Sequence, residues 1–206
     1  MTLNRAFLLA VTGVVTGSAS IPAHGQTDRR PPVEVRTAST ALEERGKAQL
    51  ERLLSTLPLE KWLFTRTVQI QARVIPHSHP VLTLSTQYLE NDTAQVATFI
   101  HEQLHWFLET PMTDSAIADL RRIHPRVPTG PPDGARDEYS TYLHLLVCLL
   151  EFDGTTELFG EPVARRILGG WRHYGWIYRE VLERPEPIRR ILEARGLARP
   201  DARVRR

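Results

Sequence analysis

The residues from Leu143 to Leu150 form an almost unbroken apolar run, in which His144 is the only strongly polar side chain. This run lies inside a segment, about 135–152, whose pattern predicts one long helix with Asp133 placed to cap it. A helix that is apolar around most of its surface must be covered by other elements on most sides. The sequence therefore predicts a central buried helix in a mostly helical domain.

The composition suits one globular domain of ordinary size and excludes several classes of partner. The chain has 206 residues, of which 41% are apolar and 24% charged. Its formal charge is +2, from 26 basic and 24 acidic residues. So small an excess gives no strong field for nucleic acid or a membrane surface, and we expect neither as a partner. The single cysteine, Cys148, excludes an internal disulfide and a multi-cysteine metal cluster.

The first residues are typical of a secretory signal peptide rather than of a folded element. Arg5 precedes the apolar run 6–15, and small residues, including Ala23 and Gly25, lead to a predicted cleavage site before Gln26. The apolar run is too short to cross a bilayer. We therefore expect a signal peptide at 1–25, a secreted or periplasmic protein, and no stable membrane anchor after cleavage. Residues 26–39 read as a loose lead-in, 40–198 as one domain and 199–206 as a basic tail.

The remaining elements are predicted from periodicity and capping signals. Thr40 and Glu43 form a capping-box pattern before a helix at 41–57. Alternating residues predict strands at 64–75 and 81–88, separated by a turn at 76–80, so we expect an antiparallel hairpin. Further helices are predicted at 93–109, 114–124, 162–168, 171–184 and 187–195. The predicted fold class is α+β, mostly α, with a small antiparallel sheet.

One motif contains the residue types and the spacing of a catalytic metal site. Residues 101–105 read His-Glu-Gln-Leu-His and lie inside the helix predicted at 93–109. Residues i and i+4 of a helix lie on one face, about 40° apart, so His101 and His105 can reach one cation. Glu102 projects beside that cation, where it can take a proton from a bound water. Zinc suits this set of nitrogen and oxygen ligands, and we expect one Zn²⁺ ion.

The flanks of the motif are apolar or uncharged, and a buried helix that carries His, Glu and His needs those groups satisfied. Residues 98–107 resemble the extended zinc-protease signature of the zincin metallopeptidase superfamily. The resemblance implies a zincin-like domain in which His101 and His105 are zinc ligands and Glu102 is the general base. It also implies a sheet beside the motif helix, whose edge strand, 81–88 here, holds an extended substrate. No narrower family is identified.

The third ligand is open between two residues of the long helix. The gluzincin-like expectation is Glu138, since gluzincins take a glutamate from a later helix. The thermolysin-like families place Asp four residues after that Glu, where this chain has Tyr142. His144 is the alternative, because it shares a polar stripe with Cys148 and Glu151 on an otherwise apolar helix. Glu151 could also hydrogen-bond a ligand histidine.

Other polar residues have secondary roles in this interpretation. His173 and Tyr174 are candidate donors to an oxyanion, a task that zincins often give to a distant His or Tyr. We interpret His77 and His79 as a solvated pair in a turn. We interpret Cys148 as an inert buried thiol.

Taken together, these features predict a secreted zinc-dependent metallohydrolase, a peptidase that acts on a peptide or protein substrate. The main alternative is a non-catalytic binding or structural protein of the cell envelope, in which zinc pins two helices together. A second alternative is an iron enzyme with two histidines and one carboxylate, which the intervening Glu102 of the motif disfavours.

Overall fold

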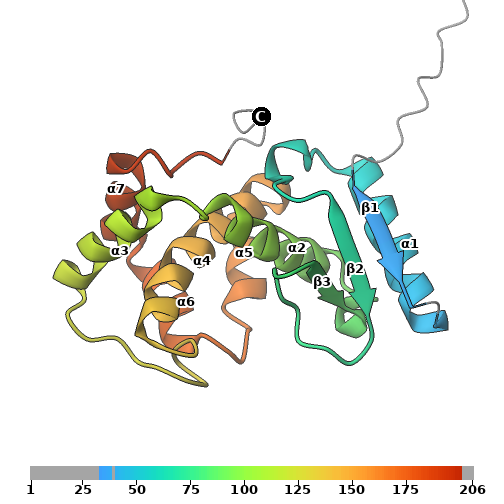
Figure 1. Cartoon of the computed structure of the whole chain (residues 1–206), viewed down its shortest axis with the longest axis horizontal. Helices are drawn as coiled ribbons and strands as arrows, with labels where there is room; N and C mark the ends of the chain where they lie inside the picture. Colours follow the sequence, from blue (N-terminus) through green and yellow to red (C-terminus); the bar gives the residue numbers. More distant parts are fainter. Residues whose placement is uncertain (1–32, 39, 201–206) are drawn as a thin grey trace, which may run out of the picture.

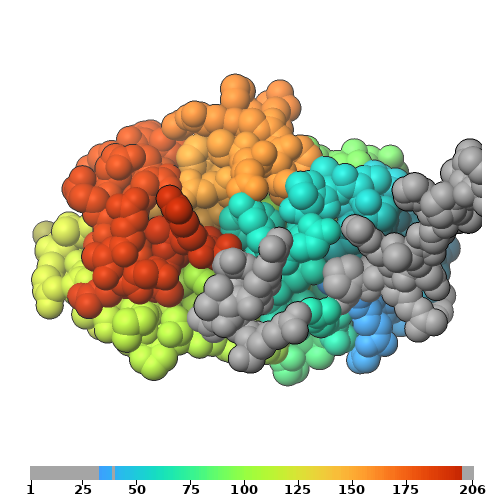
Figure 2. All heavy atoms as spheres, turned by 90° about the horizontal axis from the view of Figure 1, so that it is seen from above, coloured from blue at the N-terminus to red at the C-terminus, as the bar shows by residue number. Residues whose placement is uncertain are grey.

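The computed structural model describes residues 33–38 and 40–200. Within these ranges the chain forms seven α-helices and one three-stranded sheet (Figure 1). The sheet and the first helix lie at one end of the molecule, and the last helices lie at the other (Figures 1 and 2). The predicted signal peptide lies outside the described residues, as do the last six residues of the predicted tail. No helix in the described part is long and apolar enough to span a membrane.

The sheet consists of β1 (Glu34–Thr37), β2 (Thr67–Gln71) and β3 (Leu82–Ser85), in the order β1-β2-β3. Both strand pairs are parallel, so the predicted antiparallel hairpin is wrong. β1 also lies within 26–39, which was expected to be a loose lead-in. All four residues of β3 are buried, as is common for strands of parallel sheets.

The route of the chain between β2 and β3 explains the parallel pairing. Residues 72–81 pass along the outer edge of β3 before the strand begins. There His77 and Thr83 exchange two backbone hydrogen bonds, with N···O distances of 3.0 and 2.7 Å. The antiparallel contact is therefore one bridge between β3 and its own lead-in, while β3 pairs in parallel with β2 on its other side.

Helix α1 (Ala41–Thr56) connects β1 to β2 and packs on the sheet. Its predicted capping box is present, since Thr40 and Glu43 each accept a hydrogen bond from the other's backbone N–H. Glu43 also accepts a 3.0 Å hydrogen bond from the backbone N–H of Ala72, just after β2. A Cβ atom on Gly46 would lie 2.8 Å from the Cγ2 atom of Ile70. The absence of a side chain at Gly46 thus permits the close contact between α1 and the sheet.

Helix α2 (Asp92–Phe107) carries the His-Glu-Gln-Leu-His motif, and Asn91 caps it through the backbone N–H of Ala94. Gln103, fully buried inside the motif, fixes this helix to the segment that leads into β2. Its Oε1 atom accepts hydrogen bonds from the backbone N–H groups of Phe64 and Thr65, at 2.7 and 2.8 Å. Its Nε2 atom donates to the carbonyl of Thr65 at 3.0 Å. Every polar atom of this amide is therefore bonded to the backbone.

Helix α4 (Glu138–Phe159) is the predicted central helix, and it is longer than expected. It begins after Asp137, whose side chain accepts a hydrogen bond from the backbone N–H of Ser140, and not after Asp133. The run 145–150 has no exposed surface at all, which confirms the expected burial. The helices that contact α4 are α2, α3 (Pro111–Ile123), α5 (Glu161–Leu168), α6 (Gly175–Glu183) and α7 (Pro185–Ala194).

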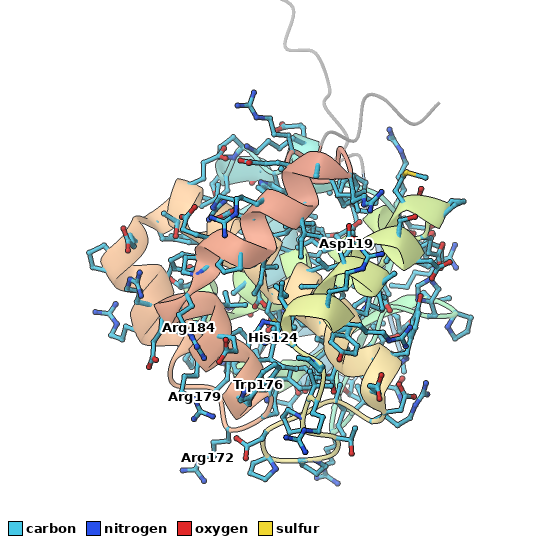
Figure 3. The ribbon with its side chains drawn as sticks, turned by 90° about the vertical axis from the view of Figure 1, so that its left-hand side faces the viewer. Asp119, His124, Arg172, Trp176, Arg179 and Arg184 are labelled. Atoms are coloured by element: carbon cyan, nitrogen blue, oxygen red, sulfur yellow. The ribbon has the colours of Figure 1, made fainter. Side chains whose placement is uncertain are left out.

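The far end of the molecule is held by polar contacts between the later helices. Asp119 of α3 accepts two hydrogen bonds from the guanidinium of Arg195, at 2.8 and 2.5 Å. The ring of His124 meets that of Trp176 edge-on, with centroids 5.5 Å apart (Figure 3). These contacts join α3 to the C-terminal helices around α4.

Candidate metal centre

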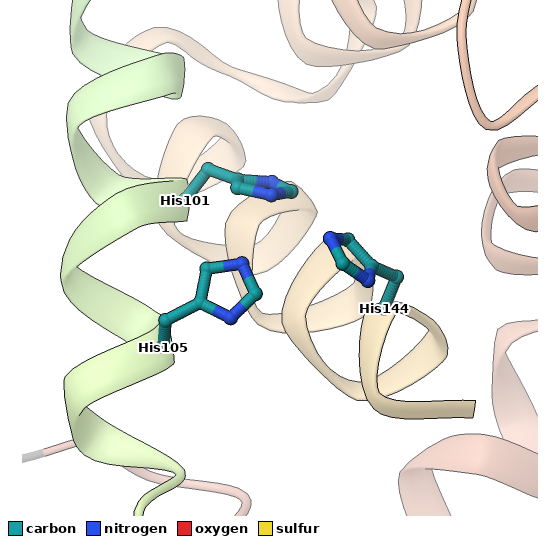
Figure 4. Close-up of side chains that lie close together, drawn as sticks. All are labelled: His101, His105 and His144. Carbon is teal, nitrogen blue, oxygen red and sulfur yellow. The ribbon is translucent and has the colours of Figure 1, made fainter. Parts of the chain in front are cut away.

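Three histidines meet where α2 packs against α4. His101 and His105 lie one turn apart on α2, and His144 lies opposite them on α4 (Figure 4). One ring nitrogen from each histidine lies within 4.8 Å of the others. The ring centroids are 5.0 to 5.5 Å apart. The structure therefore groups the rival candidate, His144, with the two motif histidines.

Hydrogen bonds to the Nδ1 atoms orient two of these rings. Nδ1 of His101 lies 2.9 Å from Oε2 of Glu151, and Nδ1 of His144 lies 2.6 Å from the carbonyl oxygen of Ser140. A carboxylate and a carbonyl both accept hydrogen bonds, so each Nδ1 carries the proton. The Nε2 atom of each ring is then left to bind a metal once it carries no proton, which is the usual arrangement of metal-binding histidines.

The pKa values of His105 and His144 also favour metal binding. Burial, and then the nearby charge on His101, lower the pKa of His105 to about 2 and that of His144 to about 3. Both rings are neutral at pH 7. Burial acts to lower the pKa of His101 as well, but the carboxylate of Glu151 holds that pKa well above the usual value. The negative charge of Glu151 contributes most to this increase, and hydrogen bonds with Cys148 and Glu151 add to it. His101 therefore has to release its Nε2 proton when a metal binds.

Glu151 is fully buried and is held from two sides. Its Oε2 atom accepts one hydrogen bond from His101 and a second from the hydroxyl of Tyr178, at 2.9 Å. Glu151 was foreseen as a support for a ligand histidine, whereas Tyr178 was not. A tyrosine on the apolar face of a helix gives no signal in the sequence that its hydroxyl bonds a carboxylate on another helix.

A second group of possible metal donors shares His101. It consists of His101, Cys148 and Glu151, whose donor atoms also lie within 4.8 Å of one another. Burial raises the pKa of the Cys148 thiol, so this sulfur remains protonated. The Glu151 carboxylate already has its two hydrogen bonds. This group is therefore satisfied without a metal, and the three histidines are the better candidate centre.

Glu102 is buried beside the three histidines but has no partner of its own. Only 6% of the residue is exposed, and within the described part of the chain its carboxylate makes no hydrogen bond or ion pair. Burial raises the pKa of Glu102 to about 7. The side chain lines a cavity of about 420 Å³, which we call the Glu102 cavity. A carboxylate so placed can accept a proton from a molecule inside that cavity.

The three histidines lie between two cavities. His101 lines the Glu102 cavity, and His105 lines a second cavity of about 470 Å³. His173 and Tyr174, the candidate oxyanion donors, both line the Glu102 cavity. The Tyr174 ring lies 4.4 Å from that of His144, and Tyr174 has a left-handed backbone with φ of 58°. Such strain in a residue other than glycine is often found at functional sites.

The structure does not bring Glu138, the first choice for third ligand, to this group. Glu138 is the first residue of α4, six positions before His144, which places it about 9 Å farther along the helix axis. Its carboxylate accepts a 3.3 Å hydrogen bond from Arg121, and its side chain is 58% exposed. Because Asp137 caps α4, the expected helical turn before Glu138 is not formed, and Glu138 lies at the helix end.

The two histidines of the predicted turn are both exposed, and they bind different partners. Nδ1 of His77 lies 3.0 Å from the carbonyl oxygen of Ile75. His79 stacks on the indole of Trp106 at 4.1 Å, and its Nε2 atom lies 2.7 Å from Glu109. Neither residue belongs to a metal-binding group in the described chain. The β3 edge that was expected to hold substrate is covered at Thr83 by His77.

Comparison with known proteins finds no matching family model, no similar curated protein and no similar solved structure.

Proposed function

We propose that this protein is a zinc-dependent hydrolase that cleaves peptide bonds. The observation that carries the proposal is the buried, unpartnered carboxylate of Glu102, which lines the same cavity as His101 of the three-histidine group. A buried charge without a partner is costly to a fold, and such groups are concentrated at reactive sites. The resemblance of residues 98–107 to the zincin signature supports the same proposal.

In this proposal His101, His105 and His144 hold one Zn²⁺ ion through ring nitrogens. Three protein ligands are typical of catalytic zinc sites, whereas structural sites have four. When bound, zinc supplies a Lewis acid that lowers the pKa of a water and polarises a carbonyl group. Glu151 holds the ring of His101 in place, and Ser140 holds that of His144.

Glu102 moves the proton. Its carboxylate accepts a proton from the attacking water and later passes it to the nitrogen of the leaving amine. Tyr174 and His173 line the same cavity and are the candidate donors to the oxygen that becomes negative. Both roles require the Glu102 cavity to hold the scissile peptide bond.

The non-catalytic alternative, in which zinc only joins α2 to α4, is disfavoured by the position of Glu102. A purely structural site has no need of an unpartnered carboxylate beside a cavity. The iron alternative is disfavoured by the donors, since the group that includes both motif histidines contains a third histidine and no carboxylate. Export to the periplasm or the outside of the cell remains part of the proposal, on the signal-like pattern of residues 1–25.

The experiment measures zinc content and hydrolysis of an unstructured protein such as casein in the same samples. Glu102→Gln should keep one zinc per chain and lose at least about 100-fold in turnover. His101→Ala, His105→Ala and His144→Ala should each lose zinc, whereas Glu138→Ala should keep it. Full activity in Glu102→Gln, or stoichiometric zinc in His144→Ala, would contradict the proposal.

A further inference from the structure

Residues 74–80 form a strap that crosses from one cavity to the other. They belong to the connection that leaves the end of β2 and returns to β3 (Figure 1). Val74, Ile75 and Pro76 line the Glu102 cavity, and His79 lines the second cavity, beside His105. The strap therefore borders both of the cavities that adjoin the candidate centre.

The strap is fixed at its far end to the motif helix. The indole Nε1 of Trp106 donates a 3.0 Å hydrogen bond to the carbonyl of Ser78. His79 stacks on the same indole and also contacts Glu109. The backbone of His77 is bonded to Thr83 of β3. An extended peptide cannot add to β3 at Thr83 while the strap is in place, so backbone pairing there does not explain substrate recognition.

Within the strap, the side chain of Ile75 is unusual because it is apolar and highly exposed. This residue is 86% exposed, whereas the other large apolar residues on the surface of the described chain are 37–45% exposed. It nevertheless lines the Glu102 cavity. Apolar side chains commonly line the cavities that bind apolar groups.

The rest of the lining of the Glu102 cavity also suits an apolar group. The rings of Tyr88 and Trp171 meet with centroids 5.2 Å apart, and Trp171 stacks on His173. Two of the charged residues in the lining are already paired, since Arg136 bonds Asp137 and Glu151 bonds His101. Among the described residues, Glu102 is the remaining charged residue of the lining, and it already has a role in the proposed function. The free surface is therefore mostly aromatic and aliphatic.

We propose that Ile75 is a specificity-determining residue and that the Glu102 cavity takes a bulky apolar side chain, such as Phe, next to the scissile bond. This inference rests on the proposed function, because it treats the cavity as the place where a peptide lies. It adds that the side chain in the cavity, and not strand addition at Thr83, selects the substrate.

The test compares two internally quenched peptides of Ala and Gly residues, one with a single central Phe and one with Ala in its place. For the zinc-loaded wild-type chain we expect kcat/KM to be at least about 10-fold higher with the Phe peptide. Ile75→Ala should lower kcat/KM about 10-fold for the Phe peptide and less than 2-fold for the Ala peptide. Leu42→Ala, at a partly exposed site on α1 outside the cavity, is the control and should change neither.

Because Ile75 is almost fully in solvent, its substitution should leave the melting temperature unchanged, which separates specificity from folding. Equal kcat/KM for the two peptides, or an equal effect of Ile75→Ala on both, would overturn the inference while leaving the hydrolase proposal intact.

A binding measurement separates this inference from the proposed function. The full chain with Glu102→Gln and added zinc is titrated with each peptide in a calorimeter. If no variant hydrolyses any peptide, tighter binding of the Phe peptide that Ile75→Ala weakens about 10-fold would support the cavity assignment alone. Binding without preference for Phe, or no binding, would overturn it.

Discussion

The Nδ1 atom of His101 lies 2.9 Å from the Oε2 atom of Glu151, and this contact joins α2 to α4 in the buried centre of the protein. The two residues lie 50 positions apart in the chain. Their hydrogen bond fixes the ring of His101 so that its Nε2 atom is left for a metal. Tyr178 in turn fixes Glu151 from α6. The orientation of His101 at the candidate centre thus depends on Glu151 and Tyr178, which lie outside the group of three histidines.

Glu151→Gln should therefore weaken zinc binding without removing any ligand. Loss of such a supporting carboxylate typically lowers metal affinity 10- to 100-fold, and we expect an increase in the zinc Kd of about that size. Tyr178→Phe should act in the same direction and more weakly. Competition with a chromogenic chelator measures the Kd. Glu157→Gln, at the exposed end of α4, is the matched control. An unchanged Kd in Glu151→Gln would contradict this role.

Gln103→Leu tests how the motif helix is anchored. The leucine fits the volume of the amide but leaves the backbone N–H groups of Phe64 and Thr65 without their acceptor. We expect the free energy of unfolding to fall by about 1–3 kcal/mol, as judged by urea denaturation of the metal-free protein. Gln71→Leu, at an exposed position, should change it by less than about 0.5 kcal/mol. Equal effects of the two substitutions would refute the anchoring role.

Gly46→Ala tests the close packing of α1 on the sheet. Alanine favours the helix by about 1 kcal/mol over glycine, but its Cβ atom would lie 2.8 Å from Ile70. Overpacking of a core costs about 1–3 kcal/mol, so we expect a net loss of up to about 2 kcal/mol in a thermal or urea unfolding experiment. Ala48→Leu, exposed on the same helix, should have little effect. A more stable Gly46→Ala protein would show that α1 lies farther from the sheet.

Glu43 should give the protein part of its pH dependence. The backbone N–H of Ala72 holds the pKa of Glu43 below its usual 4.5, against the opposing effect of burial, and Thr40 adds to the lowering. The stabilisation is therefore present above pH 4.5 and is lost as the pH falls through the lower, folded-state pKa. Glu43→Gln should be less stable than the wild type at pH 7, and the gap in urea midpoint should narrow at pH 3. A gap that is constant from pH 7 to pH 3 would exclude this account.

Local patterns in the sequence were enough to predict the helices, because helix caps and apolar periodicity are local properties. The capping box at Thr40, the burial of 145–150 and the placing of the motif within α2 all follow from neighbours in the chain. The helix expected at 171–184 begins only at Gly175, since Tyr174 adopts a left-handed backbone that no local signal requires.

The parallel sheet and the choice of third ligand could not be predicted in this way. Two strands separated by a turn are as compatible with an antiparallel hairpin as with a parallel pair. The bridge between His77 and Thr83 depends on how the strap packs on Trp106. Likewise Glu138 and His144 lie on the same helix, and only the packing of α4 against α2 places His144 beside His101.

X-ray absorption at the zinc edge tests the central claim most directly, because it reads the donor atoms around the metal in the loaded wild-type protein. We predict three imidazole nitrogens and one oxygen, at about 2.0–2.1 Å, with no sulfur. A sulfur neighbour at about 2.3 Å would place the metal on Cys148 instead, and it would contradict a centre built from His101, His105 and His144.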